Sequence, residues 1–535
     1  MRLALLALAL CALVGGINHV AVIAGILDPP SGFAPAYYIR NLDIPQYLTW
    51  GALAKDHWLL PNYHAPWQTE PALFQPMMQI VGKSSLPPVV AHYSLQFLLY
   101  WVAAYALLLA FQTFCSSRRQ MFYAAIIMIG ALPLKLCAWA AAKWLGAALP
   151  VQAGLAYGLI EYSYETADGF LRGGLSDSFT LTFGTAITLF SFTALALYTR
   201  TGERKYFIRL CLLAFVGAIL HPFEVFLVVF GSFYPLWQRN RTRHFLILGA
   251  CGAFGMLPYV IQSVRTPWLR DASDIAQWNM TTPAWILIAY GIPVFLICWL
   301  MAVRFRGPDP EDDTLQSWFL TNSLLPLIPV IPVAIHLFDG FTYCLGFLLV
   351  RKMAQDKLFQ RYGRRFRPLA WGWAAASFAV LFTAYHQIYI DGKSTNPQIG
   401  RPAIVAVNEL KMLDWMRSNL PRNRVVLAPE EMAPWVATLP QITMASHDVF
   451  SITSDAQRTA VKQFYAGDMS VIDRYGVSYV IAEQPLDGGV LRHREGNLRL
   501  YQMADRDPLP YPGHGSAPRN GPRRWLFELL GFAVR

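Results

Sequence analysis

Residues 91–114 read AHYSLQFLLYWVAAYALLLAFQTF, and this stretch decides the class of the protein. It contains no Asp, Glu, Lys or Arg, and as a helix it is long enough to cross the roughly 30 Å of hydrocarbon in a bilayer. Hydrophobic residues make up 55% of the chain, whereas charged residues make up only 14%. A soluble chain carries about 25% charged residues. The sequence therefore predicts an integral membrane protein, because lipid must cover most of so apolar a surface.

Apolar stretches of the same character recur along the first 390 residues. They lie near 3–26, 121–140, 178–198, 245–262, 284–303, 315–334, 336–350 and 369–390. Another stretch, 207–237, is interrupted in its middle by His221-Pro222, where the proline is unable to continue the hydrogen bonding of a helix. About eleven transmembrane helices are expected. The first of them, 3–26, is too long for the apolar part of a signal peptide, so we expect it to be retained.

The basic residues predict the orientation of these helices. Every second connection is basic, so that 19 Lys and Arg, counting Arg2, fall on one side and only seven on the other. Cytoplasmic loops are the basic ones, which places the N-terminus in the cytoplasm. Since both flanks of 207–237 are basic, this stretch should be two helices of about 14 residues each that turn on the outer side. The net charge of +11 is spread over these short clusters, a distribution that argues against a nucleic-acid partner.

Two regions outside the apolar stretches are expected to face the non-cytoplasmic side. Residues 27–90 form a long, proline-rich first loop, which we assign to a membrane domain spanning 1–390. Residues 391–535 form a small C-terminal α/β domain with a loose tail over 505–535. Within it we expect helices over 404–420 and 454–465, the second closed by Gly467, and short buried strands over 425–428 and 479–482.

The best candidate for chemistry is Asp43, which follows the first apolar stretch in the run Asn41-Leu-Asp-Ile-Pro-Gln-Tyr47. The chain has no P-loop, GxSxG or HExxH motif, so ionisable residues on the outer face are what remains. A carboxylate held beside a membrane-facing cavity suits a general base that deprotonates a hydroxyl acceptor. The alternative is an aspartate that caps a turn or a short helix, a frequent role for this residue.

Several short motifs resemble those of one membrane enzyme family. The chain resembles bacterial GT-C glycosyltransferases that use polyprenyl-phosphate sugars in the runs Asp43-Ile-Pro-Gln-Tyr47, Glu70-Pro-Ala-Leu-Phe-Gln-Pro76, His221-Pro222-Phe223-Glu224 and His336-Leu-Phe-Asp339-Gly340. It departs from the pattern at Ile335, where the family has Arg. The resemblance implies that Asp43 is the catalytic base and that Glu70 contacts the acceptor or a metal. It leaves the identity of any metal unknown, although a divalent cation is possible.

Other polar residues of the outer face are candidates for substrate binding, and each has a plainer alternative. Asp168 and Arg172 lie in a loop rich in acids and aromatics, which is either a sugar-binding lip or an ordinary solvated loop. Outer arginines are able to hold a lipid phosphate, or else contact headgroups and pair with acids. The remaining members of this substrate-binding set are Tyr47, His221, Glu224, Arg265, Arg270, His336 and Asp339.

The predicted function is transfer of a sugar, with inversion, from a polyprenyl-phosphate donor to a lipid, glycan or protein acceptor outside the plasma membrane. A transporter or flippase of lipid-linked sugars is the alternative of another class, and an inactive scaffold of the same fold is a third. Transporters typically show matching interrupted helices in two halves. Here only one interrupted pair, 207–237, is evident, which favours the enzyme.

Overall fold

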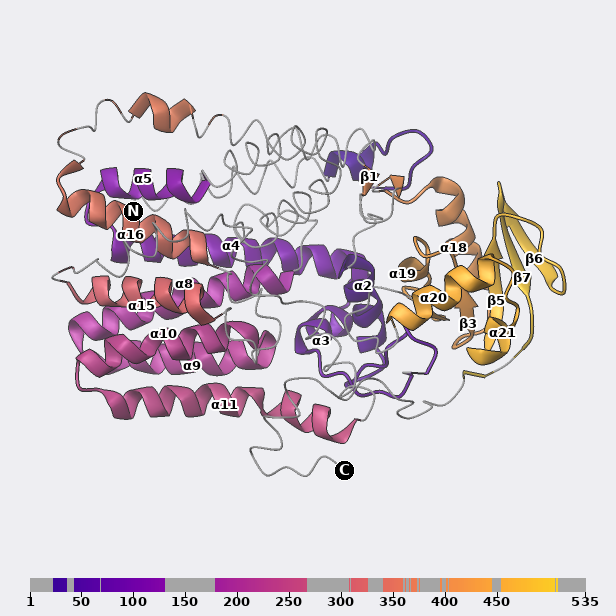
Figure 1. Ribbon diagram of the computed structural model, residues 1–535, viewed down its shortest axis with the longest axis horizontal. Coiled ribbons are helices and arrows are strands. Elements are labelled where there is room, and N and C mark those ends of the chain that lie inside the picture. Colours follow the sequence, from indigo (N-terminus) through magenta and orange to yellow (C-terminus); the bar gives the residue numbers. More distant parts are fainter. Residues whose placement is uncertain are drawn as a thin grey trace.

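A computed structural model gives the architecture of the chain, which is mostly helical with one small sheet domain (Figure 1). The structure describes residues 23–35, 43–67, 69–129, 179–266, 307, 309–325, 340–358, 361, 365, 367–372, 375, 395–396, 401–402, 404–444, 454–505 and 507–508.

A bundle of helices forms the larger part of the described chain (Figure 1). Its members are α4 (Pro88–Phe114), α5 (Arg118–Ile129), α8 (Phe179–Thr201), α9 (Arg204–Leu220), α10 (Phe223–Gln238), α11 (Thr242–Arg265), α15 (Pro310–Leu324) and α16 (Phe341–Gln355). Among the described residues, three segments are long and apolar enough to cross a membrane: Pro88–Phe114, Thr182–Thr201 and Thr242–Gln262. The expectation of apolar helices over 91–114, 178–198 and 245–262 is confirmed.

The predicted break at His221-Pro222 is also confirmed. Helix α9 ends at Leu220, His221 has an extended backbone with φ −152° and ψ 94°, and α10 begins at Phe223. The two helices are 17 and 16 residues long, rather than about 14, because α9 starts within the basic segment that precedes the apolar stretch. Each is therefore about 25 Å long, close to the thickness of the hydrocarbon.

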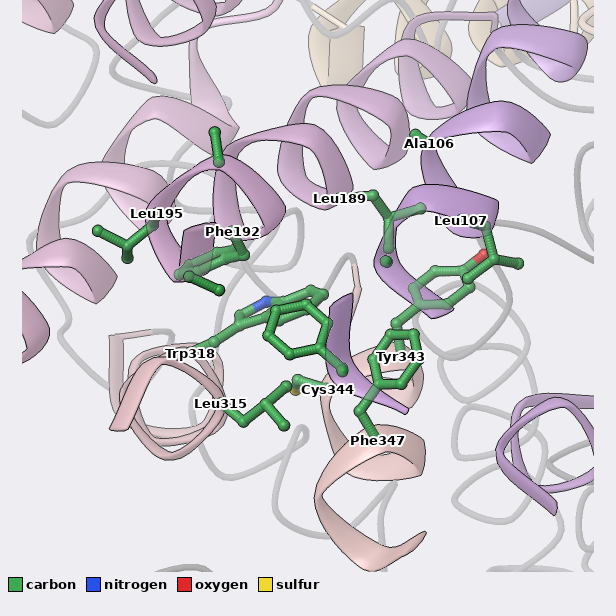
Figure 2. Packing of buried hydrophobic residues seen from close by; sticks show 14 of the residues in the cluster. Ala106, Leu107, Leu189, Phe192, Leu195, Leu315, Trp318, Tyr343, Cys344 and Phe347 are labelled. Carbon is green, nitrogen blue, oxygen red and sulfur yellow. The ribbon is translucent and has the colours of Figure 1, made fainter. Parts of the chain in front are cut away.

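Aromatic side chains hold the middle of the bundle together. The Trp318 ring on α15 stacks on the Phe192 ring of α8, with 4.5 Å between centroids and 7° between planes. Figure 2 shows this stack beside Leu315 and the side chains of α16. Helix α10 also packs closely against this stack at Gly231. A Cβ at this position would lie only 2.6 Å from the Phe192 ring, so glycine is what allows the helix to come so near. These contacts join α8, α10, α15 and α16 into one core.

One end of the bundle carries a network of ion pairs at the start of α15, which we call the α15 end. The first turn of this helix is acidic, and arginines from the ends of α8, α10 and α16 converge on it. The pairs are Arg200 with Glu311 at 2.8 Å, Arg239 with Asp313 at 4.0 Å, and Arg351 with both Asp309 and Asp312. Basic residues from three connections that the sequence assigns to one side therefore meet at one end.

The C-terminal domain is an α/β layer, as predicted. Its sheet has the order β4-β3-β5-β7-β6, in which β3 is parallel to β4 and β5, while β7 is antiparallel to β5 and β6. The elements are α18 (Val407–Asn419), β3 (Val425–Leu427), α19 (Ala433–Val436), β4 (Ile442–Thr443), α20 (Ser454–Tyr465), α21 (Ser470–Arg474), β5 (Val477–Ala482), β6 (Val490–Glu495) and β7 (Leu498–Gln502). Two short strands, β1 (Thr395–Asn396) and β2 (Arg401–Pro402), pair beside it.

The first loop contains two helices that the sequence reading did not anticipate. Helix α2 spans Asp43–Ala54 and α3 spans Pro76–Lys83. They approach each other through glycines, since a Cβ at Gly82 would lie 2.5 Å from the Ala54 Cβ and one at Gly51 would lie 2.9 Å from Val81. In Figure 1 the two helices lie between the bundle and the C-terminal domain.

The first loop also supplies residues to both cores of the C-terminal domain. Ile44 and Leu48 of α2 are buried with Met412 and Leu413 of α18, on the face of the sheet that α18 and α19 cover. Tyr63 is buried on the other face, among residues of α20 and α21. Burial of an aliphatic side chain contributes about 1.5–3 kcal/mol, so these contacts hold the loop to the domain.

Candidate functional site

Helix α2 places Asp43 where the bundle meets the C-terminal domain. Asp43 is the first residue of α2, and Tyr47 and Trp50 follow it at the i+4 and i+7 positions. The Tyr47 ring lies over the imidazole of His92 on α4, with 6.2 Å between centroids and 27° between planes, and meets Trp50 edge-on at 5.8 Å. One part of α2 therefore contacts the bundle, while Ile44 and Leu48 belong to the core of the C-terminal domain.

Further along α4 from His92, polar side chains are buried between α4 and α8. Gln96, one turn further along α4, donates from Nε2 to the Thr182 Oγ1 at 3.1 Å, and neither residue is exposed. Buried polar groups in an apolar bundle are costly unless they are paired, and where they occur they commonly mark functional positions. His92 is a candidate that the sequence reading missed. The signal was a lone histidine in the first turns of an otherwise apolar stretch.

The structure brings two predicted site residues, His221 and Glu224, into direct contact. The His221 Nδ1 and the Glu224 Oε2 share a hydrogen bond of 2.6 Å, and both side chains are buried. The backbone N–H of His221 still donates to the Gly217 carbonyl at 2.7 Å, so the side chain is not needed to satisfy it. Within the described chain, the second carboxylate oxygen, Oε1, has no hydrogen-bond partner. Among the described candidate residues, an acid and an imidazole are therefore held together away from solvent.

A glycine on α8 makes room for this carboxylate. A Cβ at Gly184 would lie 2.0 Å from the Glu224 Oε1, far closer than atoms approach one another. Gly184→Ala is therefore expected to displace Glu224 and to lower the free energy of unfolding by about 1–3 kcal/mol. The measurement is unfolding of the purified protein in mixed detergent micelles as the fraction of denaturing detergent rises.

Gly249→Ala on α11 is the matched control. A Cβ there would meet only Val229, at an ordinary contact distance of 4.0 Å. Alanine is the better helix former by up to about 1 kcal/mol, so this variant should be as stable as the unsubstituted protein or slightly more stable. Equal stability of the two variants would contradict the close approach of Glu224 to α8.

The loop after α2 is tied to the C-terminal domain by specific hydrogen bonds. Tyr63 donates from its hydroxyl to the Asn423 Oδ1 at 2.5 Å, and its carbonyl accepts from the Thr443 backbone N–H at 2.8 Å. Burial raises the pKa of Tyr63, partly opposed by the charge of Arg422, so the phenol stays protonated and remains a donor. These two hydrogen bonds therefore attach the chain just after α2 to the C-terminal domain.

The same loop also contacts the end of α11, which in turn is bonded to the end of α9. The backbone N–H of Phe74 donates to the Gln262 Oε1 at 2.6 Å, and the Tyr259 hydroxyl of α11 donates to the Ile219 carbonyl at 2.6 Å. Of the predicted site residues in this region, Glu70 is exposed in the loop that the Leu60–Leu73 bridge closes, and Arg265 is the exposed last residue of α11.

The remaining predicted site residues lie outside the described part of the chain. They are Asp168, Arg172, Arg270, His336 and Asp339. Within the described residues, no group of three or more His, Cys, Asp or Glu side chains is arranged to hold a metal ion. The site that the structure describes therefore consists of α2 with Tyr47, the buried His92, and the His221–Glu224 pair.

Comparison with known proteins adds no family assignment. No protein-family model matches the chain, and no curated protein matches it.

Proposed function

We propose that this chain is a polytopic enzyme of the plasma membrane that transfers a sugar from a polyprenyl-phosphate donor to an acceptor outside the cytoplasm. The observation that carries the proposal is the position of α2. This helix begins at Asp43, contacts the apolar bundle through Tyr47 and His92, and contributes Ile44 to the C-terminal domain. A donor with a lipid tail arrives through the bilayer, whereas the acceptor hydroxyl arrives from water. A base that serves both must stand at such a junction.

The proposed topology has about eleven spans, a cytoplasmic N-terminus and an external C-terminal domain. Three described segments have the length and composition of membrane spans, which supports the proposal that the chain crosses the membrane. The ion pairs of Arg200, Arg239 and Arg351 lie at the α15 end, and α2 with the C-terminal domain lies at the opposite end (Figure 1). Arginines collect on the cytoplasmic side of membrane proteins, so this arrangement favours an external α2.

In the proposed reaction the acceptor oxygen attacks the anomeric carbon while the bond from that carbon to the phosphate oxygen breaks. The hydroxyl proton passes to the Asp43 carboxylate, and polyprenyl phosphate leaves as the anion. A single displacement inverts the anomeric configuration. The charge of the leaving phosphate needs donors or cations on the outer face. Arg172, Arg265 and Arg270 remain candidates for that role, and Glu70, Asp168, His336 and Asp339 remain candidates for holding sugar or acceptor.

Purified protein in lipid nanodiscs tests the proposal. When supplied with a panel of polyprenyl-phosphate sugars and a membrane extract as the source of acceptor, it should release free polyprenyl phosphate. Heat-inactivated protein is the control for spontaneous hydrolysis. A flippase would move the lipid-linked sugar without cleaving the glycosyl phosphate, and an inactive scaffold would do neither. Absence of release with every donor, from protein shown to be folded, would contradict the enzymatic proposal.

A further inference from the structure

The α2–α3 segment presents apolar and basic side chains together on its surface. We name this surface the headgroup patch and define it by Lys55, Trp58, Leu59, Ile80, Lys83 and Leu86, all of which are exposed. Trp58 is 72% exposed, which is unusual for the largest apolar side chain in a well-packed region. The sugar-transfer proposal uses none of these six residues.

The geometry fixes these side chains in place. Gln79, which is buried, donates from Nε2 to the carbonyls of His57 and Trp58 at 3.0 and 2.9 Å, so the chain before Leu59 is clamped against α3. The Lys83 ammonium lies 5.1 Å from the centre of the Trp58 ring and donates to the Lys55 carbonyl at 2.9 Å. Trp58 and Lys83 therefore form a prearranged pair on the outside of the protein.

The patch adjoins a helix that is able to span a membrane. Leu86 precedes the first residue of α4, Pro88, by two positions, and α4 is one of the three candidate spans. Exposed side chains continue along α4 at positions 90, 97, 98 and 105, which share one face of the helix. The patch thus lies where this apolar face begins.

The composition of the patch matches the headgroup level of a bilayer. Tryptophan is enriched at the membrane–water interface, because its ring is amphipathic, and lysine extends its ammonium toward phosphate while its stem stays apolar. Asp56, an exposed acid, follows Lys55 directly in the sequence, and Lys55 and Lys83 together outweigh its charge.

From these observations we propose that the headgroup patch lies in the phospholipid headgroup layer, with Trp58, Leu59, Ile80 and Leu86 in contact with the upper acyl chains and Lys55 and Lys83 in contact with lipid phosphates. This surface anchors α2 and α3 at a fixed depth beside α4. The inference rests on membrane insertion of α4 and does not depend on sugar transfer.

Spin labels on single cysteines, introduced after replacement of the seven native cysteines by alanine, test this depth. The test positions are Trp58→Cys and Ile80→Cys in full-length protein in nanodiscs. Two exposed positions give the scale: Phe254→Cys on the candidate span α11, which is 69% exposed, and Leu491→Cys on β6, which is 50% exposed. Collision with oxygen, which dissolves in lipid, is compared with collision with a water-soluble nickel chelate.

The labels at 58 and 80 should give oxygen-to-nickel ratios between those of the two scale positions. Lys55→Gln with Lys83→Gln should shift the ratio at position 80 toward the value of position 491. A lipid-like ratio at position 254 shows that the background is folded and inserted. Ratios at 58 and 80 equal to that of position 491 would overturn the proposal, as would labels shielded from both reagents, since a protein partner would then cover the patch.

Discussion

Asp43→Asn should slow the release of polyprenyl phosphate by about 10²–10⁴-fold, the usual loss when a positioned general base is removed. Asparagine keeps the size of the side chain and most of its hydrogen bonding, but it does not accept the acceptor proton near neutral pH. Donor binding should change much less than turnover, because the proposed base acts on the acceptor in the transition state. Single-turnover release in nanodiscs, together with donor affinity measured separately, checks both expectations.

Asp28→Asn is the matched control for this experiment. Asp28 is an exposed aspartate of the same first loop, and its substitution should leave the rate within the error of the assay. If Asp43 merely capped the start of α2, Asp43→Asn would instead lower stability by about 1 kcal/mol or less and leave the rate of the folded protein nearly intact. Full turnover in Asp43→Asn would remove this residue from the mechanism, and Glu70 and Asp168 would be tested next.

Asp312→Ala should destabilise the bundle by about 3 kcal/mol, the lower end of the range for breaking a buried ion pair. The Asp312 side chain is 1% exposed and bonds the guanidinium of Arg351, which also donates to the Phe114 carbonyl at 3.2 Å. Without Asp312, the buried guanidinium of Arg351 keeps its ion pair with Asp309 at 2.7 Å. The Asp309 side chain is largely exposed, so this remaining pair compensates the buried charge less well. Unfolding in mixed micelles measures the loss.

The neighbouring acid provides the control. Asp313 is 30% exposed and lies 4.0 Å from Arg239, which is itself partly exposed. Exposed pairs of this kind contribute roughly 0–1 kcal/mol, so Asp313→Ala should have little effect. A similar loss in both variants would mean that the acidic turn of α15 acts as a whole, and that the single Asp312–Arg351 contact is not decisive.

Local signals in the sequence were enough to predict many elements. Pro222 lacks an N–H, so the break in the hairpin could be placed to the residue. Helix α20 has its predicted bounds of Ser454–Tyr465, because a periodic apolar pattern ends at Gly467, whose φ of +109° favours glycine. The strands at β3 and β5 were predicted because they are wholly buried and therefore apolar throughout.

Other elements carried misleading local signals. The prolines of the first loop suggested irregular structure, yet Pro45 and Pro76 occupy the first turns of α2 and α3, where a missing N–H costs nothing. Strand β6 was missed because it is largely exposed and carries Arg492 and Arg494, so that it lacks the alternation of a half-buried strand. Its turn at Gly496, with φ +60°, was the usable signal.

The candidate site was predicted only in part, for a different physical reason. The contact of His221 with Glu224 is local, because the two residues lie three apart in the sequence, and both were predicted as site residues from one short motif. The stacking of Tyr47 on His92 and the packing of α2 into the C-terminal domain depend on contacts between distant segments. No pattern within one segment encodes which distant segment it will meet.

Because the first loop packs on the C-terminal domain, part of the protein must wait for the end of translation before it can fold. Tyr63 bonds Asn423 across 360 residues of chain. At translation rates of roughly 5–20 residues per second, the partner of Tyr63 is made some 20–70 s after Tyr63 itself. Throughout that interval α2 and its apolar residues have left the ribosome without the core that covers them. Folding of the region around α2 is therefore expected to be among the last steps in biogenesis, and a nascent chain arrested before residue 404 should leave α2 open to protease.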